Sequence, residues 1–168
     1  MSRPKSLYGA NPAGILTRAE AEGLAKRALS FAKADETAIS ISSDARANTR
    51  FAVNQVSTAG NDTDTTVTIR STFGKRSASV TTNKADDASL AAAVKAAEEL
   101  ARLSAENPEY MPDLGPQTYP PERQQNISFP TAEDRARAVK AVTDRARAAG
   151  FIATGYIDPD SGALLMNR

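Results

Sequence analysis

The pattern in this sequence that is most typical of a binding surface is an arginine set among asparagines. In residues 47–61, ANTRFAVNQVSTAGN, the side chains alternate as in a β-strand, and one face carries Asn48, Arg50 and Asn54. We interpret Arg50 as an anchor that contacts another polypeptide through its guanidinium fork. Arg70, on the outward face of a later strand, is a further candidate contact residue. The alternative is an ordinary solvated face, which antiparallel sheets often present on one side.

Residues suited to catalysis are scarce. The 168 residues include no histidine and no cysteine. A Ser-His-Asp triad and a thiolate metal site are therefore excluded, and a hydrolytic zinc site nearly always uses an imidazole. No pair of carboxylates lies in an apolar setting that would separate two pKa values. We predict no catalytic, cofactor-binding or metal-binding residue, and a chain that is inactive by itself.

The charge balance restricts the partners. Lys and Arg number 21 against 20 Asp and Glu, so the formal net charge is +1. A duplex-binding protein needs a concentrated positive face to displace counterions, so no nucleic-acid partner is predicted. No apolar run is long enough to span a membrane, and the N-terminus lacks the apolar core of a secretory signal. These features favour a cytoplasmic protein without a membrane partner.

Hydrophobic periodicity predicts a mixed order of helices and strands. Apolar stripes at helical spacing indicate three helices, over 17–34, 86–105 and 131–149. Alternation indicates four successive strands, over 37–43, 47–55, 63–73 and 76–83, with turn chemistry in AGND at 59–62. Asn61, Asp62 and Asp64 are interpreted as turn residues. The helices have capping residues at their starts, namely Thr17 with Glu20, Asp86 or Asp87, and Thr131 with Asp134.

These elements predict an α+β fold, with an antiparallel β meander, helices packed on one face of the sheet, and a C-terminal β hairpin over 151–168. We expect an N-terminal tail over 1–14 and a single domain over 15–168. A proline-rich connection over 107–130 lies inside that domain, where Tyr110, Met111, Leu114 and Tyr119 could pin it to the surface. The chain stops at Arg168 inside a predicted strand, so we expect a domain truncated at its C-terminus.

The third predicted helix has a strongly charged side. Its inward stripe is predicted to be Val139, Val142, Ala146 and Ala149. The opposite side carries Arg137, Lys140, Asp144 and Arg147. Because Asp144 lies one turn from both Lys140 and Arg147, we interpret this side as a self-paired, solvated face. A docking patch is the alternative.

Four stretches resemble segments of one known protein family in their order and spacing. RFAVNQVSTAGN resembles a strand that ends in an Asn and a variable turn, and TIRSTFGKRSASVTTN resembles the family's glycine-containing hairpin, with Ser77 or Ala78 in place of its second glycine. AAVKAAEELARLSAENPEYMPDLGP resembles the following helix and its exit. AAGFIATGYIDPDSGALLMNR resembles the approach to the family's asparagine-containing motif. The family that these stretches resemble is the TldD/PmbA family, and the resemblance covers residues 15–168.

This resemblance implies the N-terminal, non-catalytic domain of a longer metallopeptidase-system protein that acts in proteolysis of peptides. Its role would be subunit assembly or enclosure of a peptide substrate. The implied partners are a missing C-terminal domain, and a TldD-type subunit in a homo- or hetero-oligomer. Zinc would belong to that domain or subunit, and the resemblance does not decide whether the full protein is the catalytic type. The alternative function is a freestanding protein- or peptide-binding module without protease activity.

Overall fold

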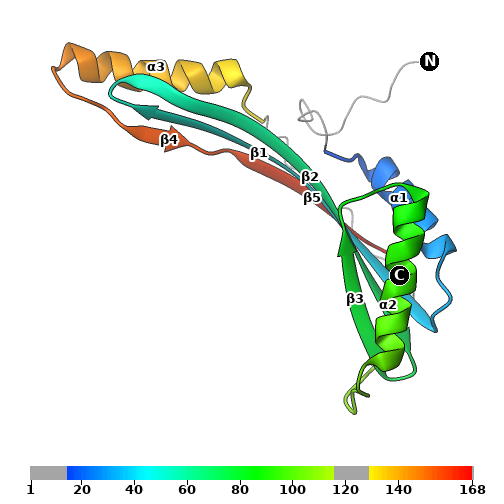
Figure 1. The fold of residues 1–168 in the computed structure, drawn as a ribbon. Helices are drawn as coiled ribbons and strands as arrows, with labels where there is room; N and C mark the ends of the chain where they lie inside the picture. Colours follow the sequence, from blue (N-terminus) through cyan, green and yellow to red (C-terminus); the bar gives the residue numbers. More distant parts are fainter. Residues whose placement is uncertain (1–14, 116–128, 168) are drawn as a thin grey trace, which may run out of the picture. The chain divides into compact units, whose positions relative to one another are not determined.

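A computed structural model describes residues 15–115 and 129–167 of the chain. Within these residues the chain forms three helices and five strands (Figure 1). In chain order they are α1 (Arg18–Ser30), β1 (Glu36–Ala52), β2 (Gln55–Phe73), β3 (Arg76–Thr82), α2 (Asp87–Leu103), α3 (Ala132–Ala148), β4 (Gly155–Ile157) and β5 (Asp160–Asn167). None of the helices in this part of the chain is long and apolar enough to cross a membrane.

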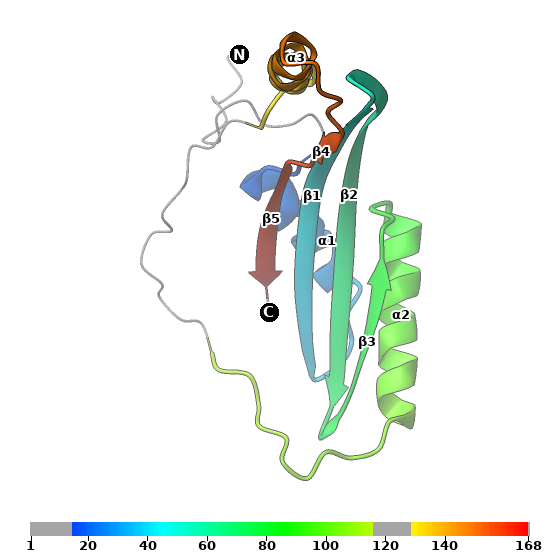
Figure 2. The ribbon, with the colours of Figure 1, turned by 90° about the vertical axis from the view of Figure 1, so that its left-hand side faces the viewer.

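The strands form one sheet in the order β3-β2-β1-β4, and β5 also pairs with β1 (Figure 2). The pairs β2–β3 and β1–β4 are antiparallel, with Ile69 opposite Val80 and Arg50 opposite Tyr156. Successive strands β1, β2 and β3 are neighbours, as in a meander. The predicted α+β class, with an antiparallel meander and C-terminal strands, is confirmed.

The two C-terminal strands both have β1 as their partner. β4 pairs with residues 49–51 of β1, and the amide of Ala47 then donates to the carbonyl oxygen of Pro159 at 3.0 Å. Proline has no N–H to donate to a ladder, which accounts for the interruption between β4 and β5. The two strands that were predicted to form a hairpin therefore each pair with β1, β4 first and β5 after it along the chain.

β1 is longer than predicted, because the two separate runs at 37–43 and 47–55 belong to one strand. Alternate residues from Ile39 to Phe51 are buried without a break in the pattern. Asp44 and Arg46, which lie between the two predicted runs, occupy outward positions of this strand, where charged side chains remain in contact with water. The predicted inward face is confirmed up to Phe51, but Val53 is exposed in the turn.

The predicted turn at AGND is wrong, because these four residues lie inside β2. Asn61, Asp62 and Asp64 are strand residues, not turn residues. Turn propensity is a local preference, and pairing of β2 with β1 overrides it here. The chain reverses instead at Val53 and Asn54, close to the strand end predicted near Asn54 and Gln55.

Contacts within the chain divide it into two compact units, and β1 and β2 contribute to both. Of the described residues, the α3 unit contains 15, 44–64 and 129–162, and the α1–α2 unit contains 16–43, 65–115 and 163–167. The core of the α1–α2 unit is formed by small residues of the helices against aliphatic strand residues. Its larger members include Leu24, Ile39, Ile41, Val67, Ile69, Leu90 and Val94.

The helix starts agree with the predicted caps. Thr17 and Glu20 form a capping box on α1, and Thr131 and Asp134 form one on α3. Asp86 caps α2 through the backbone N–H of Ser89 at 2.9 Å. Each cap satisfies a backbone donor that has no partner inside the helix.

The buried stripe of α3 differs from the prediction. Arg135, Val139 and Thr143 are buried, at intervals of four residues, whereas Val142 is 48% exposed. The predicted stripe was displaced because it counted apolar residues only. The polar head of Arg135 is buried with hydrogen-bond acceptors around it, as described below.

The start of the proline-rich connection is attached to the α1–α2 unit. The phenol of Tyr110 donates a hydrogen bond to the Glu36 carboxylate, and Asn107 N donates to the carbonyl oxygen of Lys75 at 3.0 Å. Met111 and Leu114, which were predicted to pin the segment, are exposed. Tyr119 lies outside the described residues.

Gly155 is predicted to be essential for close packing of β4 on β1. A Cβ atom at this position would lie 2.8 Å from Cζ of Phe51, which is a buried ring directly opposite on β1. Gly155→Ala should therefore lower the free energy of unfolding by about 2 kcal/mol, as expected for overpacking. Denaturant titration followed by circular dichroism measures this. Gly23→Ala is the matched control, because nothing lies within 4 Å of its new Cβ. Equal stability of the two variants would contradict the packing argument.

Candidate functional site

Three of the four candidate contact residues lie in the α3 unit. Asn48 and Arg50 are exposed on the outward face of β1. Arg50 is directly opposite Tyr156 of β4, so the guanidinium and the phenol share one face of the sheet. Tyr156 is 72% exposed although it is a large aromatic residue. An exposed Arg and Tyr side by side form a pair of the kind that is enriched at protein interfaces.

Asn54 has a structural role at the β1–β2 turn. Its side-chain amide donates to the Phe151 carbonyl oxygen at 2.9 Å, and its Oδ1 accepts from the Ala153 amide at 2.7 Å. Its own backbone N–H donates to the Ala153 carbonyl oxygen at 3.1 Å, and Arg147 donates to its carbonyl oxygen. Asn54 therefore holds the turn against the segment that connects α3 to β4. Its polar atoms already form hydrogen bonds within the chain.

The turn beside Asn54 is strained. Val53 has φ 50° and Asn54 has φ 60°, both in the left-handed region. Asn tolerates this region, whereas a β-branched residue such as Val rarely adopts it because of its crowded Cβ. Val53 is nevertheless 65% exposed, so packing of its side chain does not compensate for the strain. Strain of this kind is often retained at positions that have a function.

Arg70 belongs to the α1–α2 unit and has a partner within it. Its guanidinium forms an ion pair with Asp113 at 2.7 Å. This pair attaches the chain after α2 to the outward side of β2. Arg70 thus fixes the proline-rich connection, and its predicted contact with another polypeptide stays a prediction.

Arg135 is a buried cation that was not among the predicted inward residues of α3. It is 3% exposed, and all its observed acceptors are neutral. Nε donates to Thr49 Oγ1 at 3.1 Å, Nη1 to the Pro130 carbonyl oxygen at 3.0 Å, and Nη2 to Asn61 Oδ1 at 2.7 Å. One guanidinium therefore ties α3 to β1 and β2 within the α3 unit. The only available signal was its spacing of four residues from Val139.

The polar side of α3 is self-paired, as predicted. Asp144 lies 2.5 Å from Lys140 and 3.2 Å from Arg147. The hydrogen bond from Lys140 lowers the pKa of Asp144 below its usual value. In the α1–α2 unit, the hydrogen bond to Glu36 raises the pKa of Tyr110, because it stabilises the neutral phenol. The first shift arises from a pair within α3, and the second from a contact between residues 74 positions apart in the sequence.

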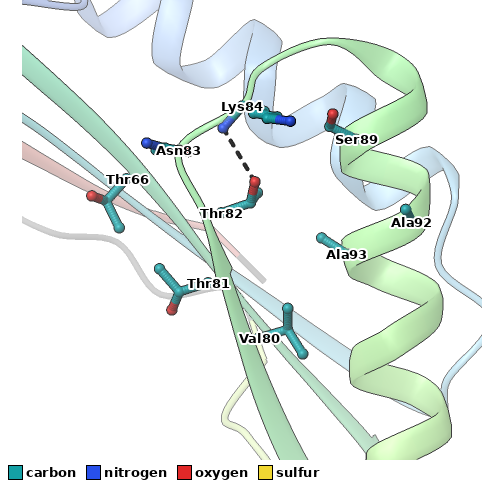
Figure 3. A pocket seen from close by; sticks show the side chains of 9 residues that line it. All are labelled: Thr66, Val80, Thr81, Thr82, Asn83, Lys84, Ser89, Ala92 and Ala93. Atoms are coloured by element: carbon teal, nitrogen blue, oxygen red, sulfur yellow. Dashed lines mark hydrogen bonds between the residues drawn. The ribbon is translucent and has the colours of Figure 1, made fainter.

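A cleft of about 570 Å³ lies in the α1–α2 unit, between the end of β3 and the start of α2 (Figure 3). Its lining residues are Thr66, Val80, Thr81, Thr82, Asn83, Lys84, Ser89, Ala92 and Ala93. The lining has hydroxyls, an amide and an ammonium group, but no carboxylate or imidazole that could form an acid–base pair with Lys84. The cleft therefore provides no catalytic constellation.

No group of three or more His, Cys, Asp or Glu residues that could hold a metal ion occurs in the described parts of the chain. The sequence as a whole supplies neither imidazole nor thiolate. These residues do not fit a zinc centre, whose usual ligands are His nitrogen and Cys sulfur, with carboxylate oxygen as a further ligand. No chemical step through a metal is assigned to this chain.

Comparison with known proteins agrees with the α+β fold. Residues 38–101 match the family described as PmbA/TldA metallopeptidase domain 1. The matched stretch contains most of β1, all of β2 and β3, and most of α2. Over these residues the chain is therefore similar to the first domain of that family. No curated protein matches the chain in sequence.

Solved structures show the same fold. TldE from Thermococcus kodakarensis is similar with a TM-score of 0.66 and 15% identity, over 87% of this chain and 34% of that protein. A proposed modulator of a DNA gyrase from Thermotoga maritima is similar with a TM-score of 0.60 and 12% identity, over 86% of this chain and 34% of that protein. The chain therefore spans about a third of the length of these proteins.

Replacement of Val53 should test the strain at the turn. Val53→Asn places a residue that tolerates positive φ at an exposed position, so it should raise the free energy of unfolding by about 1 kcal/mol. Thermal and denaturant unfolding measure the change. Val56→Asn is the matched control, because Val56 is also exposed but lies in β2. A loss of stability in Val53→Asn would show that the valine is not strained.

Removal of the Arg135 guanidinium should destabilise the α3 unit. Arg135→Met keeps a long side chain but leaves the acceptors on Pro130 and Asn61 without their donor, at a cost of about 2 kcal/mol. Arg137→Met on the same helix is the control, because the Arg137 side chain is exposed and pairs only locally with Asp134. Hydrogen exchange at the amides of α3 reports the local effect. If the α3 amides of Arg135→Met are as well protected from exchange as those of the unchanged protein, the Arg135 guanidinium does not hold α3 to β1 and β2.

Proposed function

We propose that this chain is the non-catalytic N-terminal part of a TldD/PmbA-type peptidase system, in which it serves subunit assembly or encloses a peptide substrate. The match of residues 38–101 to the first domain of this family carries the proposal. The matched stretch includes Arg50 and the turn at Val53, so these two exposed positions lie in the part of the chain that is similar to the family's first domain. This location supports a contact function for these positions.

The chemistry of peptide hydrolysis has to come from outside this chain. A zinc-activated water needs a set of ligands that these 168 residues do not offer. Zinc would be bound by a C-terminal domain or by a partner subunit of the TldD type. This chain then positions the peptide substrate and shields it from solvent, through the sheet face at Arg50 and the α3 unit. This chain would form one side of the space that encloses the peptide substrate.

The partners we propose are accordingly proteins and peptides. A C-terminal domain and a TldD-type subunit, in a homo- or hetero-oligomer, are the main candidates. The formal net charge of +1 supports neither nucleic acid nor a membrane as a partner. A cytoplasmic location is part of the same proposal.

The proposal predicts how the chain behaves alone and with a partner. Alone, it should take up no stoichiometric zinc and hydrolyse no labelled unstructured peptide, since it lacks imidazole and thiolate ligands. Mixed with a TldD-type subunit, it should form a complex in sedimentation velocity. Tight stoichiometric zinc uptake by the chain, or the absence of any complex, would overturn the assignment.

Arg50 gives the same experiment a residue-level test. Arg50→Ala should weaken the complex about tenfold if the guanidinium is an interface anchor, because Arg is frequent among residues that dominate binding energy. Arg18→Ala is the control, since Arg18 is highly exposed on α1 and pairs with Glu22. If assembly and peptide turnover are the same for Arg50→Ala as for the unchanged protein, Arg50 has no such role.

A further inference from the structure

The outer side of β2 is open along residues 55–62, a segment called the open edge here. β2 has 19 residues, and β3 pairs with only the part from Val67 to Phe73 (Figure 2). β1 lies on the other side of β2. Among the residues that the structure describes, no strand pairs with the open edge on the side away from β1. The backbone N–H and C=O groups that point to this side are therefore a template for another strand.

The open edge lacks the features that normally prevent such pairing. Residues 55–61, QVSTAGN, contain no charged residue and no proline, and all of them except Gly60 are exposed. On the opposite edge of the sheet, Pro159 stands between Asp158 and Asp160 and separates β4 from β5. β3 is only seven residues long and packs against α2. Charges, prolines and short strands are the usual protection of sheet edges.

The open edge is held in place before any partner arrives. Near one end, Asn61 Oδ1 accepts from the buried Arg135 guanidinium at 2.7 Å. Next to the other end, the side chain of Asn54 bonds to the backbone of Phe151 and Ala153. Because the strand is fixed at both ends, it loses little conformational entropy when it pairs.

The charges around the open edge favour neither an acidic nor a basic partner. Over its described residues the α3 unit has seven Lys or Arg and eight Asp or Glu, a formal net charge of −1. On β2 itself, the charged residues nearest to the middle of the open edge are Asp62 and Asp64. A second copy of this nearly neutral surface would therefore meet no strong repulsion.

The side chains of the open edge distinguish a second copy from a foreign strand. Added strands gain affinity from main-chain hydrogen bonds, and pockets for their alternate side chains provide the specificity. Residues 57–60 are Ser, Thr, Ala and Gly, whose small side chains form no walls for such pockets. Two copies of this segment, in contrast, present the same donors and acceptors to each other and can approach closely.

We propose that the open edge pairs with the open edge of a second copy of this chain, antiparallel about a twofold axis close to Ala59. An interface of this kind is self-complementary, and it joins the strands β4-β1-β2 of the two copies into one sheet. Ala59 lies near the middle of the open edge, so this register pairs most of its residues. Ser57 of each copy then lies opposite Asn61 of the other.

This register also separates the carboxylates of the two copies. Asp62 and its counterpart would lie about 20 Å apart along the strands, which exceeds the screening length at physiological salt. The inference goes beyond the proposed function, because pairing of two identical edges requires neither a TldD-type subunit nor a peptide substrate.

Charge-swap variants test the proposal on the 168-residue chain. The unchanged protein should form a reversible dimer in sedimentation equilibrium. Ala59→Lys should weaken this dimer at least about tenfold, because two ammonium groups would lie opposite each other. A mixture of Ala59→Lys and Ala59→Glu should associate again, since opposite charges then meet. Such recovery shows that both variants are folded. Ala138→Lys, at an exposed alanine on α3 of the same unit, is the matched control and should dimerise normally.

Cross-linking tests the register independently. The chain contains no cysteine, so a single introduced cysteine reports only its own position. Opposed residues of an antiparallel pair have Cα atoms about 4.5–5.5 Å apart, which is within the range of a disulfide. Ala59→Cys should therefore form a covalent dimer under mild oxidation, whereas Ala138→Cys should remain monomeric on a non-reducing gel.

Three results would reject the proposal. One is an unchanged protein that stays monomeric at every concentration measured. Another is equal dimerisation of Ala59→Lys and the unchanged protein, which would place the contact elsewhere on the chain. The third is a charge-swap mixture that does not associate, together with no cross-link at Ala59→Cys. Because none of these measurements involves a TldD-type subunit, their failure is separate from failure of the proposed function.

Discussion

The structure depends on the unbroken two-residue alternation of β1. Seven alternate positions from Ile39 to Phe51 are buried, and they serve the cores of both units. Large aliphatic residues occupy the first of these positions, where α1 and α2 supply the opposing side chains. Small or hydroxylated residues follow, from Ser43 to Thr49. A one-residue slip would turn this whole series toward solvent, so the register of β1 is strongly specified.

Two fully buried polar residues of β1, Ser43 and Thr49, have hydrogen-bond partners. The hydroxyl of Ser43 accepts from the Leu16 amide at 3.0 Å and lies 3.1 Å from Thr65 Oγ1. Thr49 accepts from the buried Arg135. Burial of a hydroxyl without such a partner is unfavourable, so these hydrogen bonds offset the cost of burying Ser43 and Thr49. They also restrict how α1 and α3 can attach to the strand.

Local signals in the sequence were sufficient for the helices and the fold class. Caps such as Thr17 with Glu20 involve residues three apart, and the alternation around Ile39 and Phe51 is readable directly. Strand boundaries were harder to predict, because residues 59–62 favour a turn locally and become strand only through pairing with β1. Their conformation is decided by a neighbour that is distant in sequence. The same limit applies to the length of β1.

The candidate site shows this limit most clearly. The exposure of Arg50 follows from alternation, but its position opposite Tyr156 depends on a strand more than a hundred residues later. Asn54 was predicted as a contact residue, and its atoms are bonded to Phe151 and Ala153, 97 and 99 residues away. Arg135 had no local signal strong enough to predict its burial. Long-range hydrogen bonds thus decide which polar residues hold the fold and which remain available for contact.

The turn at Val53 connects these points. The bonds made by Asn54 use its side chain and both backbone polar atoms for structure, so its neighbour Val53 is held with its side chain directed away from the core. The same bonds bring Phe151 and Ile152 to the turn while leaving them exposed. The hydrogen bonds of Asn54, called the polar clamp here, therefore place exposed apolar side chains together at the turn. Since the clamp stabilises the strained turn in the absence of a partner, the surface is preorganised, and a partner that binds there need not order it.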